Sequence, residues 1–256
     1  MKEFFGFGGY ARAAEGYMSW QHLTFVSLLM AVTIALAAVL GVRYRGRAEK
    51  ERMKPLAWAA FLIDGIEIFR IVMICWRERD ALGWLYMLPL FLCSIQLITI
   101  PLAAFAKGRL KEAALDFVAI FGLLGAVLGT YGAGQNYACY PVLSIDNVAS
   151  GVTHCISGFA ALYILISGSA SLKKRNVPVT YAILTAFCAV AYIVDLILPY
   201  NYMFLIRGDG TPYDIVYDLV GGSPVFYPLA VYLLFLIYIA AFYAVYYLVF
   251  GRKKRV

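Results

Sequence analysis

The sequence contains five cysteines and two histidines, and we consider one pair of them, Cys93 and His154, for nucleophilic catalysis. Cys93 lies in the stretch LPLFLCSIQ, where Pro89 is expected to kink a helix and to open space beside the sulfur. Because the thiolate is the nucleophile, a thiol in an apolar site needs a base. His154 could take that proton, as in other Cys–His pairs. The alternatives are that Cys93 is an inert buried thiol and that His154 binds a backbone carbonyl at a helix end.

Other polar side chains interrupt apolar stretches, where ionisable groups are costly and mark function by default. Glu67 and Arg70 are three residues apart and could form an ion pair, either as a structural link or to orient a histidine or hold a lipid phosphate. Interfacial packing is the alternative for His22. We expect these side chains to line a polar pocket that opens toward the outer leaflet. The supporting residues are Glu67, Arg70, Gln96, Asp195, Asn201 and His22.

The composition identifies the surroundings of these residues as a membrane. The 256 residues are 63% hydrophobic and 14% charged, whereas soluble domains carry about 25% charged residues. We predict an all-α, polytopic membrane protein that forms one domain over residues 1–256, with seven transmembrane helices. The expected spans are residues 20–42, 55–76, 84–106, 112–131, 148–168, 179–199 and 224–250.

The basic residues predict the orientation of these spans, because cytoplasmic loops are enriched in Lys and Arg. Sixteen of the 22 basic residues lie in the loops after the first, third and fifth spans and at the C-terminus. We therefore expect the N-terminus outside and the C-terminus in the cytoplasm. The net charge of +7 is then explained by topology and lipid contact, and no nucleic-acid partner is expected.

Several other classes of site lack their motifs. There is no phosphate-binding glycine loop, HExxH zinc motif or nucleophile elbow, and we expect no metal and no cofactor. One histidine per span does not favour haem. The last span holds no lysine before Lys253, so a retinal Schiff base is not expected. Cys139 and Cys155 both fall on the outer side, and a disulfide between them is left open.

The sequence also resembles a known family. Leu88–Ser94 resembles the LPLHLC signature of the YwaF-type bacterial integral membrane proteins. Asn201–Leu205 (NYMFL) and Gly221–Tyr227 resemble that family's NYMFL…GPWPWY stretch. The positions of His22, Glu67 and His154 agree with the same pattern. The resemblance covers essentially the whole chain.

The YwaF-type proteins are similar to a vertebrate transmembrane acyltransferase that acts on ether phospholipids and, more distantly, to androgen-induced membrane ester hydrolases. The resemblance implies that Cys93 and His154 are the catalytic residues. The chain departs from the pattern at Phe91, where many relatives have histidine, and at Cys155, which replaces a second histidine. Loss of the imidazole at position 91 either removes a proton-handling group or alters the pocket.

These observations together predict a membrane acyltransferase or transacylase that works through an acyl-thioester on Cys93. Glu67 or Asp195 would orient His154, and Gln96, Ser94 or Asn201 would donate to the oxyanion. The alternatives are a lipid-binding or transport protein, a membrane ester hydrolase, and a receptor or structural subunit. Phospholipids, lysophospholipids and the bilayer are the expected partners, without an obligate protein partner. The expected location is the cell membrane, as in a bacterial inner membrane.

Overall fold

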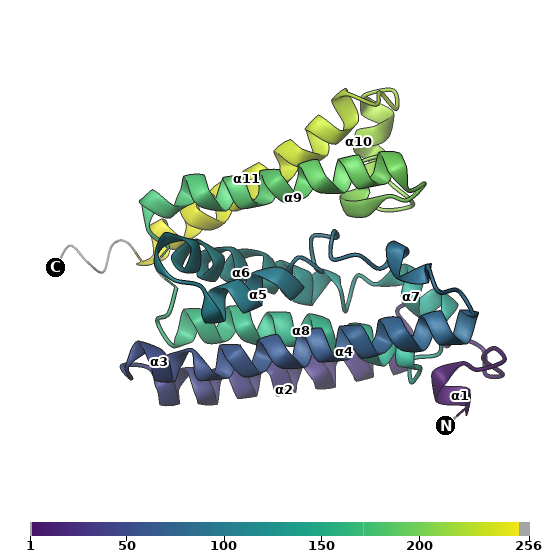
Figure 1. Cartoon of the computed structure of the whole chain (residues 1–256), viewed down its shortest axis with the longest axis horizontal. Helices are drawn as coiled ribbons and strands as arrows, with labels where there is room; N and C mark the ends of the chain where they lie inside the picture. Colours follow the sequence, from purple (N-terminus) through teal and green to yellow (C-terminus); the bar gives the residue numbers. More distant parts are fainter. Residues whose placement is uncertain (1, 171, 251–256) are drawn as a thin grey trace. The chain divides into compact units, whose positions relative to one another are not determined.

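The long apolar runs form helices, because a helix satisfies backbone N–H and C=O groups within its own segment. The computed structural model describes residues 2–170 and 172–250, and all the regular elements within them are helices. The described residues form two compact units, residues 2–170 and residues 172–250 (Figure 1). The expectation of one membrane domain over the whole chain stays a prediction.

The first unit is built around α8 (Ile145–Ile166), which packs against three other long helices. These are α2 (Trp20–Tyr44), α4 (Lys54–Glu78) and α6 (Gly108–Leu128). The shorter α5 (Gln96–Phe105) packs between α4 and α6. The connecting segments contain α1 (Lys2–Phe5), α3 (Glu49–Arg52), the 3₁₀ helix η1 (Gly83–Tyr86) and α7 (Gly134–Cys139).

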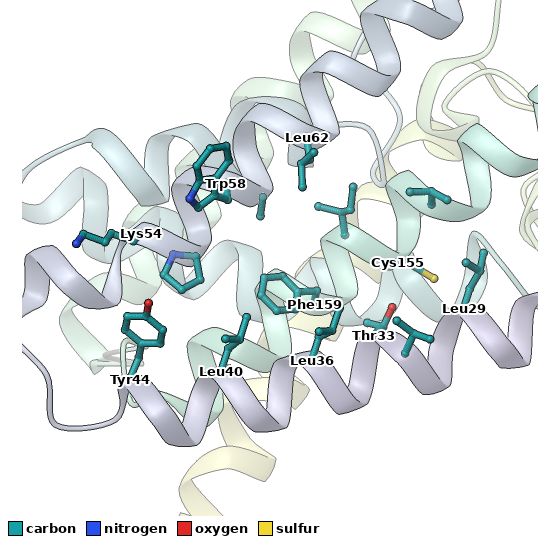
Figure 2. A pocket seen from close by; sticks show the side chains of 15 residues that line it. Leu29, Thr33, Leu36, Leu40, Tyr44, Lys54, Trp58, Leu62, Cys155 and Phe159 are labelled. Atoms are coloured by element: carbon teal, nitrogen blue, oxygen red, sulfur yellow. The ribbon is translucent and has the colours of Figure 1, made fainter.

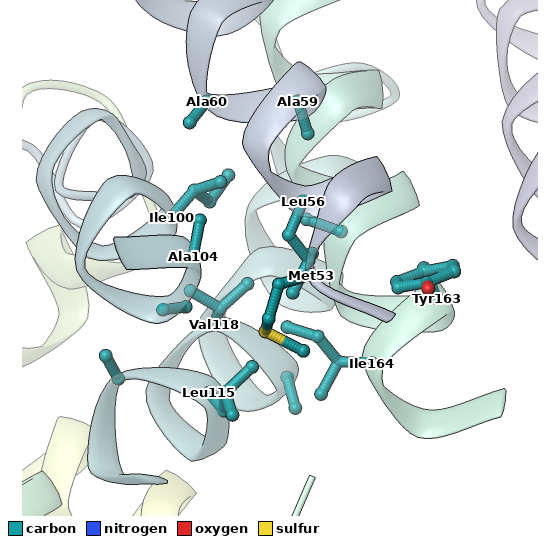
Figure 3. Packing of buried hydrophobic residues seen from close by; sticks show 14 of the residues in the cluster. Met53, Leu56, Ala59, Ala60, Ile100, Ala104, Leu115, Val118, Tyr163 and Ile164 are labelled. Atoms are coloured by element: carbon teal, nitrogen blue, oxygen red, sulfur yellow. The ribbon is translucent and has the colours of Figure 1, made fainter. Parts of the chain in front are cut away.

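The core of this unit lies where α4, α5, α6 and α8 converge (Figure 3). Leu56 of α4, Ile100 of α5, Val118 of α6 and Ile164 of α8 are fully buried there. Small residues bring α6 and α8 close together, as is common where membrane helices pack. A Cβ atom on Gly158 of α8 would lie 2.7 Å from the Cβ of Ala126 on α6.

The second unit consists mainly of α9 (Val177–Ile197) and α11 (Phe226–Phe250). Tyrosine and threonine hydroxyls connect the two helices. Tyr232 bonds Thr185 at 2.7 Å, and Tyr243 bonds Thr180 at 3.3 Å. Tyr192 donates to the carbonyl of Pro224 at 3.0 Å. The remaining elements are the 3₁₀ helices η2 (Lys174–Asn176) and η3 (Tyr202–Phe204) and the short helix α10 (Tyr213–Leu219).

Six of the seven expected spans correspond to long helices whose ends lie within four residues of the predicted ones. The third expected span, residues 84–106, is wrong as a continuous helix. Residues 87–95 form turns, and helix α5 begins only at Gln96. Pro89 has no N–H to donate, and the side chain of Ser94 bonds the backbone of Phe91, so local bonds replace helical ones.

Within the part of the chain that the structure describes, four helices are long and apolar enough to cross a membrane: Trp20–Tyr44, Ile145–Ile166, Lys174–Ile197 and Phe226–Val249. Charged side chains set α4 and α6 apart from these four. Helix α4 carries Asp64, Glu67 and Arg70, and α6 carries Asp116 together with charges in its first turn. The described residues are thus all-helical and include several helices suited to span a membrane, and the count of seven stays a prediction.

The predicted orientation also stays a prediction, and the C-terminal cluster Arg252–Arg255 lies outside the described residues. The open question of a disulfide has an answer. Cys139 and Cys155 are both free thiols, the first exposed and the second buried.

Candidate active site

Cys93 lies on the turn that leads into α5, two residues before the N-cap residue Ile95. Ser94 holds this turn: its Oγ accepts the N–H of Phe91 at 2.9 Å and donates to the carbonyl of Phe91 at 3.1 Å. The backbone N–H groups of Cys93 and Ser94 lie near the sulfur and favour its charged form. Backbone N–H groups and the positive end of a helix dipole both stabilise a thiolate. The half-buried thiol therefore occupies a position suited to a nucleophile.

His154 lies on α8, and its imidazole lies near the Cys93 thiol, so that the charges of the two side chains act on each other. Its Nδ1 lies 2.7 Å from the carbonyl oxygen of Ser150. Because a carbonyl can only accept, Nδ1 carries the proton, and Nε2 is left as the basic nitrogen. Ser150 thus holds the imidazole where we expected Glu67 or Asp195. We considered a carbonyl contact of His154 as an alternative to catalysis. The imidazole makes that contact through Nδ1 and still lies near Cys93.

Gly125 of α6 and Gly129, the C-cap residue of that helix, make room for the pair. A Cβ atom on Gly129 would lie 2.1 Å from Nε2 of His154, well inside van der Waals contact. One on Gly125 would lie 3.5 Å from the Cβ of Cys93. Residues four apart share a helix face, so the thiol and the imidazole lie side by side on one face of α6. We did not predict Gly125 and Gly129, although their spacing is typical of close helix packing.

The Glu67–Arg70 ion pair is formed on α4, as its spacing allowed. Arg70 Nε donates to Glu67 Oε2 at 3.0 Å, and a second bond joins the guanidinium to Glu67 Oε1. The side chains are only 23% and 12% exposed. The charge of Arg70 acts on Cys93 and that of Glu67 acts on His154. The ion pair therefore lies near the Cys–His pair and contributes charge to its surroundings.

Gln96 is the first residue of α5, one turn after Cys93, and is fully buried. Its Oε1 accepts a hydrogen bond from Thr99 Oγ1 at 3.1 Å. Its Nε2 has no partner among the described residues. A buried amide without a partner costs about 1–3 kcal/mol, so an acceptor supplied by a ligand would recover energy here. Gln96 is the supporting residue best suited to donate to an oxyanion.

His22 makes the packing contacts that we considered as the alternative to a place in the polar pocket. Its Nδ1 accepts the N–H of Met18 at 3.2 Å, and its Nε2 donates to the carbonyl of Thr130 at 3.1 Å. The ring also lies against Tyr137, with the ring centres 3.8 Å apart. Both ring nitrogens are thus engaged in joining the start of α2 to the end of α6, and His22 is a packing residue.

Asp195 and Asn201 belong to the second unit, where they close the loop after α9. Asp195 Oδ1 accepts the N–H of Tyr202 at 2.7 Å. Asn201 Nδ2 donates to the carbonyl of Arg207 at 2.7 Å and to Asp209 Oδ2 at 2.8 Å. Their described bonds are local, so the first unit alone brings together Cys93, His154, Glu67, Arg70 and Gln96.

A second buried ion pair, which the sequence did not reveal to us, fixes the start of α8. Arg77 at the end of α4 donates to both oxygens of Asp146, at 2.7 and 3.1 Å. Tyr10 donates to Asp146 Oδ2 at 2.5 Å. Burial and the neighbouring carboxylate raise the pKa of the Tyr10 phenol, which keeps it a donor. Asp146 lies one turn before Ser150 and two before His154, so this cluster anchors the part of α8 that carries the imidazole.

Comparison with known proteins places this arrangement in a family. No curated protein and no solved structure matches the chain. A family model does match, that of the TMEM164 family, over residues 17–246. The match includes the turn with Cys93, the α6 glycines and the α8 segment with His154, and it spans most of both units. The chain therefore belongs to the TMEM164 family, a family of membrane proteins.

Proposed function

We propose that this protein is a membrane-embedded lipid acyltransferase or transacylase that uses Cys93 as nucleophile and His154 as base. The observation that carries the proposal is that Cys93 and the His154 imidazole both lie against Gly125 and Gly129, with Nδ1 of the imidazole held by the Ser150 carbonyl. This tautomer leaves Nε2 to accept a proton, which is the requirement for a Cys–His nucleophile. The resemblance to the YwaF-type proteins and to the ether-phospholipid acyltransferase supports the same roles.

The reaction proceeds in two halves. Nε2 of His154 takes the thiol proton, and the thiolate attacks the carbonyl carbon of a phospholipid acyl ester. The tetrahedral intermediate collapses to a thioester, and the leaving lysophospholipid alkoxide takes the proton from His154. The hydroxyl of a second lysophospholipid then gives its proton to His154 and attacks the thioester, which restores the thiol. No nucleotide is consumed, because one ester replaces another.

The oxyanion of each intermediate needs preformed donors, and these usually contribute the largest share of catalysis. The unpartnered Nε2 of Gln96 and the backbone N–H groups next to Cys93 support this role. The lipid substrate is confined to the bilayer, so part of the rate comes from its fixed orientation. The proposed topology has seven spans with the N-terminus outside, in a cell membrane such as a bacterial inner membrane.

Reconstituted protein tests the proposal. Vesicles of phosphatidylcholine with a labelled sn-2 acyl chain receive unlabelled lysophosphatidylethanolamine as acceptor. We expect label in phosphatidylethanolamine with wild type, and loss of transfer in Cys93→Ala and His154→Ala. Cys155→Ala is the matched control. This buried thiol follows His154 in the sequence, but its side chain faces α2 and α4. Labelled free fatty acid in place of transfer would indicate a membrane ester hydrolase. Equal turnover in wild type and Cys93→Ala would refute the proposal.

A further inference from the structure

An apolar groove of about 500 Å³ runs along the first unit between α2 and α4, with residues of α8 between them (Figure 2). We propose that this groove binds one acyl chain of an anionic phospholipid, whose headgroup lies at the loop between α2 and α4. The site is separate from the candidate active site and does not depend on the proposed reaction. Cys155 lines the groove, whereas the neighbouring His154 lies against Gly129 of α6.

The dimensions and lining of the groove fit an acyl chain. Its lining on α2 runs from Leu29 to Tyr44, which corresponds to about 22 Å along a helix axis. That length exceeds half of the ~30 Å hydrocarbon core. Leu36 and Trp58 on its two walls are 51% and 67% exposed. An unfilled gap between helices forfeits dispersion contacts, and a flexible methylene chain restores them.

The polar groups of the groove are concentrated at one end. Tyr44 of α2 and Lys54 of α4 lie together there, beside the loop that joins the two helices (Figure 2). The rest of the lining is apolar except for Thr33 and Cys155. An amphiphile with one polar end and one long apolar chain matches this distribution.

Charge identifies the headgroup as anionic. Residues 43–54 contain six basic and two acidic residues. Both acidic residues are already paired: Glu49 with Lys111 at 2.6 Å and Glu51 with Lys54 at 2.9 Å. Arg43, Arg47 and Lys50 are exposed on the same segment. Each basic residue next to a membrane raises the affinity for anionic lipid about fivefold. The predicted topology puts this loop, and hence the lipid, at the cytoplasmic leaflet.

Native mass spectrometry of the full chain in detergent tests the proposal, with palmitoyl-oleoyl phosphatidylglycerol and phosphatidylcholine as probes. We expect one phosphatidylglycerol to bind more tightly than phosphatidylcholine. Leu36→Trp fills the groove and should weaken that binding at least tenfold. Val39→Trp is the matched control, because Val39 is exposed on α2 but does not line the groove. Arg47→Gln combined with Lys50→Gln should reduce affinity for phosphatidylglycerol about 25-fold.

Three results would overturn the proposal. One is equal loss of lipid in Leu36→Trp and Val39→Trp, which indicates general contact with the helix surface. Another is equal binding of the two lipids by wild type, which removes the role of the basic loop. The third is unchanged binding in both Leu36→Trp and Leu62→Trp, the corresponding substitution on α4. Cys93→Ala should bind phosphatidylglycerol as wild type does, which separates this site from the proposed catalysis.

Discussion

The imidazole of His154 is positioned by two backbone features. The Ser150 carbonyl holds Nδ1, and the missing side chain of Gly129 leaves space for the ring. Neither feature depends on a second ionisable group. A side chain added at Gly129 should therefore move the imidazole relative to Cys93. This can be tested without altering either reacting group.

Gly129→Ala should displace the imidazole, because the new Cβ would lie 2.1 Å from Nε2. A shift of about 1 Å in a reacting group can cost on the order of 100-fold in rate, and we expect a loss of at least that size in acyl transfer. Gly125→Ala is the matched control, because its Cβ would make an ordinary 3.5 Å contact with Cys93. Equal activity of the two variants would contradict the assigned position of His154.

Gln96→Leu should lower the rate of acyl transfer without lowering the stability of the fold. Loss of an oxyanion donor lowers the rate by about 100- to 1,000-fold. The melting temperature should stay the same or rise, because the variant removes a buried amide that lacks a partner. Thr99 keeps its bond to the Ile95 carbonyl in this variant. The test compares the rate of acyl transfer with the melting temperature. A fall of both together would show that Gln96 is a structural residue.

At the scale of residues, the sequence indicated the candidate reacting residues but not the groups that position them. Cys93 and His154 could be chosen because the chain has few nucleophiles and two histidines. Ser150 and Gly129 act through a carbonyl and an absent side chain, which carry no chemical signal in a single sequence. For His22, residue type does not reveal that Met18 and Thr130 bond its two nitrogens, so the choice between a pocket role and packing needed the structure.

Among the elements, α8 is the one on which the candidate site depends most. It carries Ser150 and His154 and packs against α2, α4 and α6. The Arg77–Asp146 pair ties its first turn to the end of α4, and both side chains are less than a tenth exposed. The pair therefore links the stability of the unit to the placement of the imidazole.

Arg77→Leu should destabilise the protein by about 3–5 kcal/mol, because it leaves the Asp146 carboxylate buried without its partner. Arg79→Gln, an exposed change two residues away, is the control and should have little effect. The double variant Arg77→Leu with Asp146→Leu should recover most of the loss. Thermal unfolding in detergent measures all three proteins. Equal melting temperatures for Arg77→Leu and wild type would contradict a structural role for the pair.

The extent of each element could be predicted from apolar run length wherever the run was uninterrupted, as for α2 and α11. The apolar run over residues 84–106 does not form one continuous helix, because hydropathy carries no information about local hydrogen bonds. Pro89 and the Ser94 side chain convert its first half into turns, although the residues are as apolar as a helix requires.

For the molecule as a whole, the asymmetry of basic residues predicts that the N-terminus faces outward. Cys139 provides a native reporter, because it is exposed and follows α6 on the predicted outer side. An impermeant maleimide should label it in intact cells, and Cys139→Ala should abolish that signal. A cysteine introduced by Arg47→Cys in the Cys139→Ala background should react only after permeabilisation. The reverse pattern would contradict the predicted topology.

The lengths of the apolar runs and the distribution of charge do not predict the division into two units. Both units contain long apolar helices of similar composition, so the sequence shows no boundary near residue 171. Which helices pack together depends on small residues such as Gly158 and on hydroxyl bonds such as Tyr232–Thr185. These features become informative only when partners are known.

The most direct measurement is the intact mass of the protein after incubation with mixed phospholipids. The account predicts one added acyl group on wild type and on Cys155→Ala, removable by neutral hydroxylamine as expected for a thioester. The adduct should be absent from Cys93→Ala and should fail to accumulate in His154→Ala. An adduct of the same size and yield on Cys93→Ala, or lipid turnover that proceeds unchanged without Cys93, would contradict the central claim.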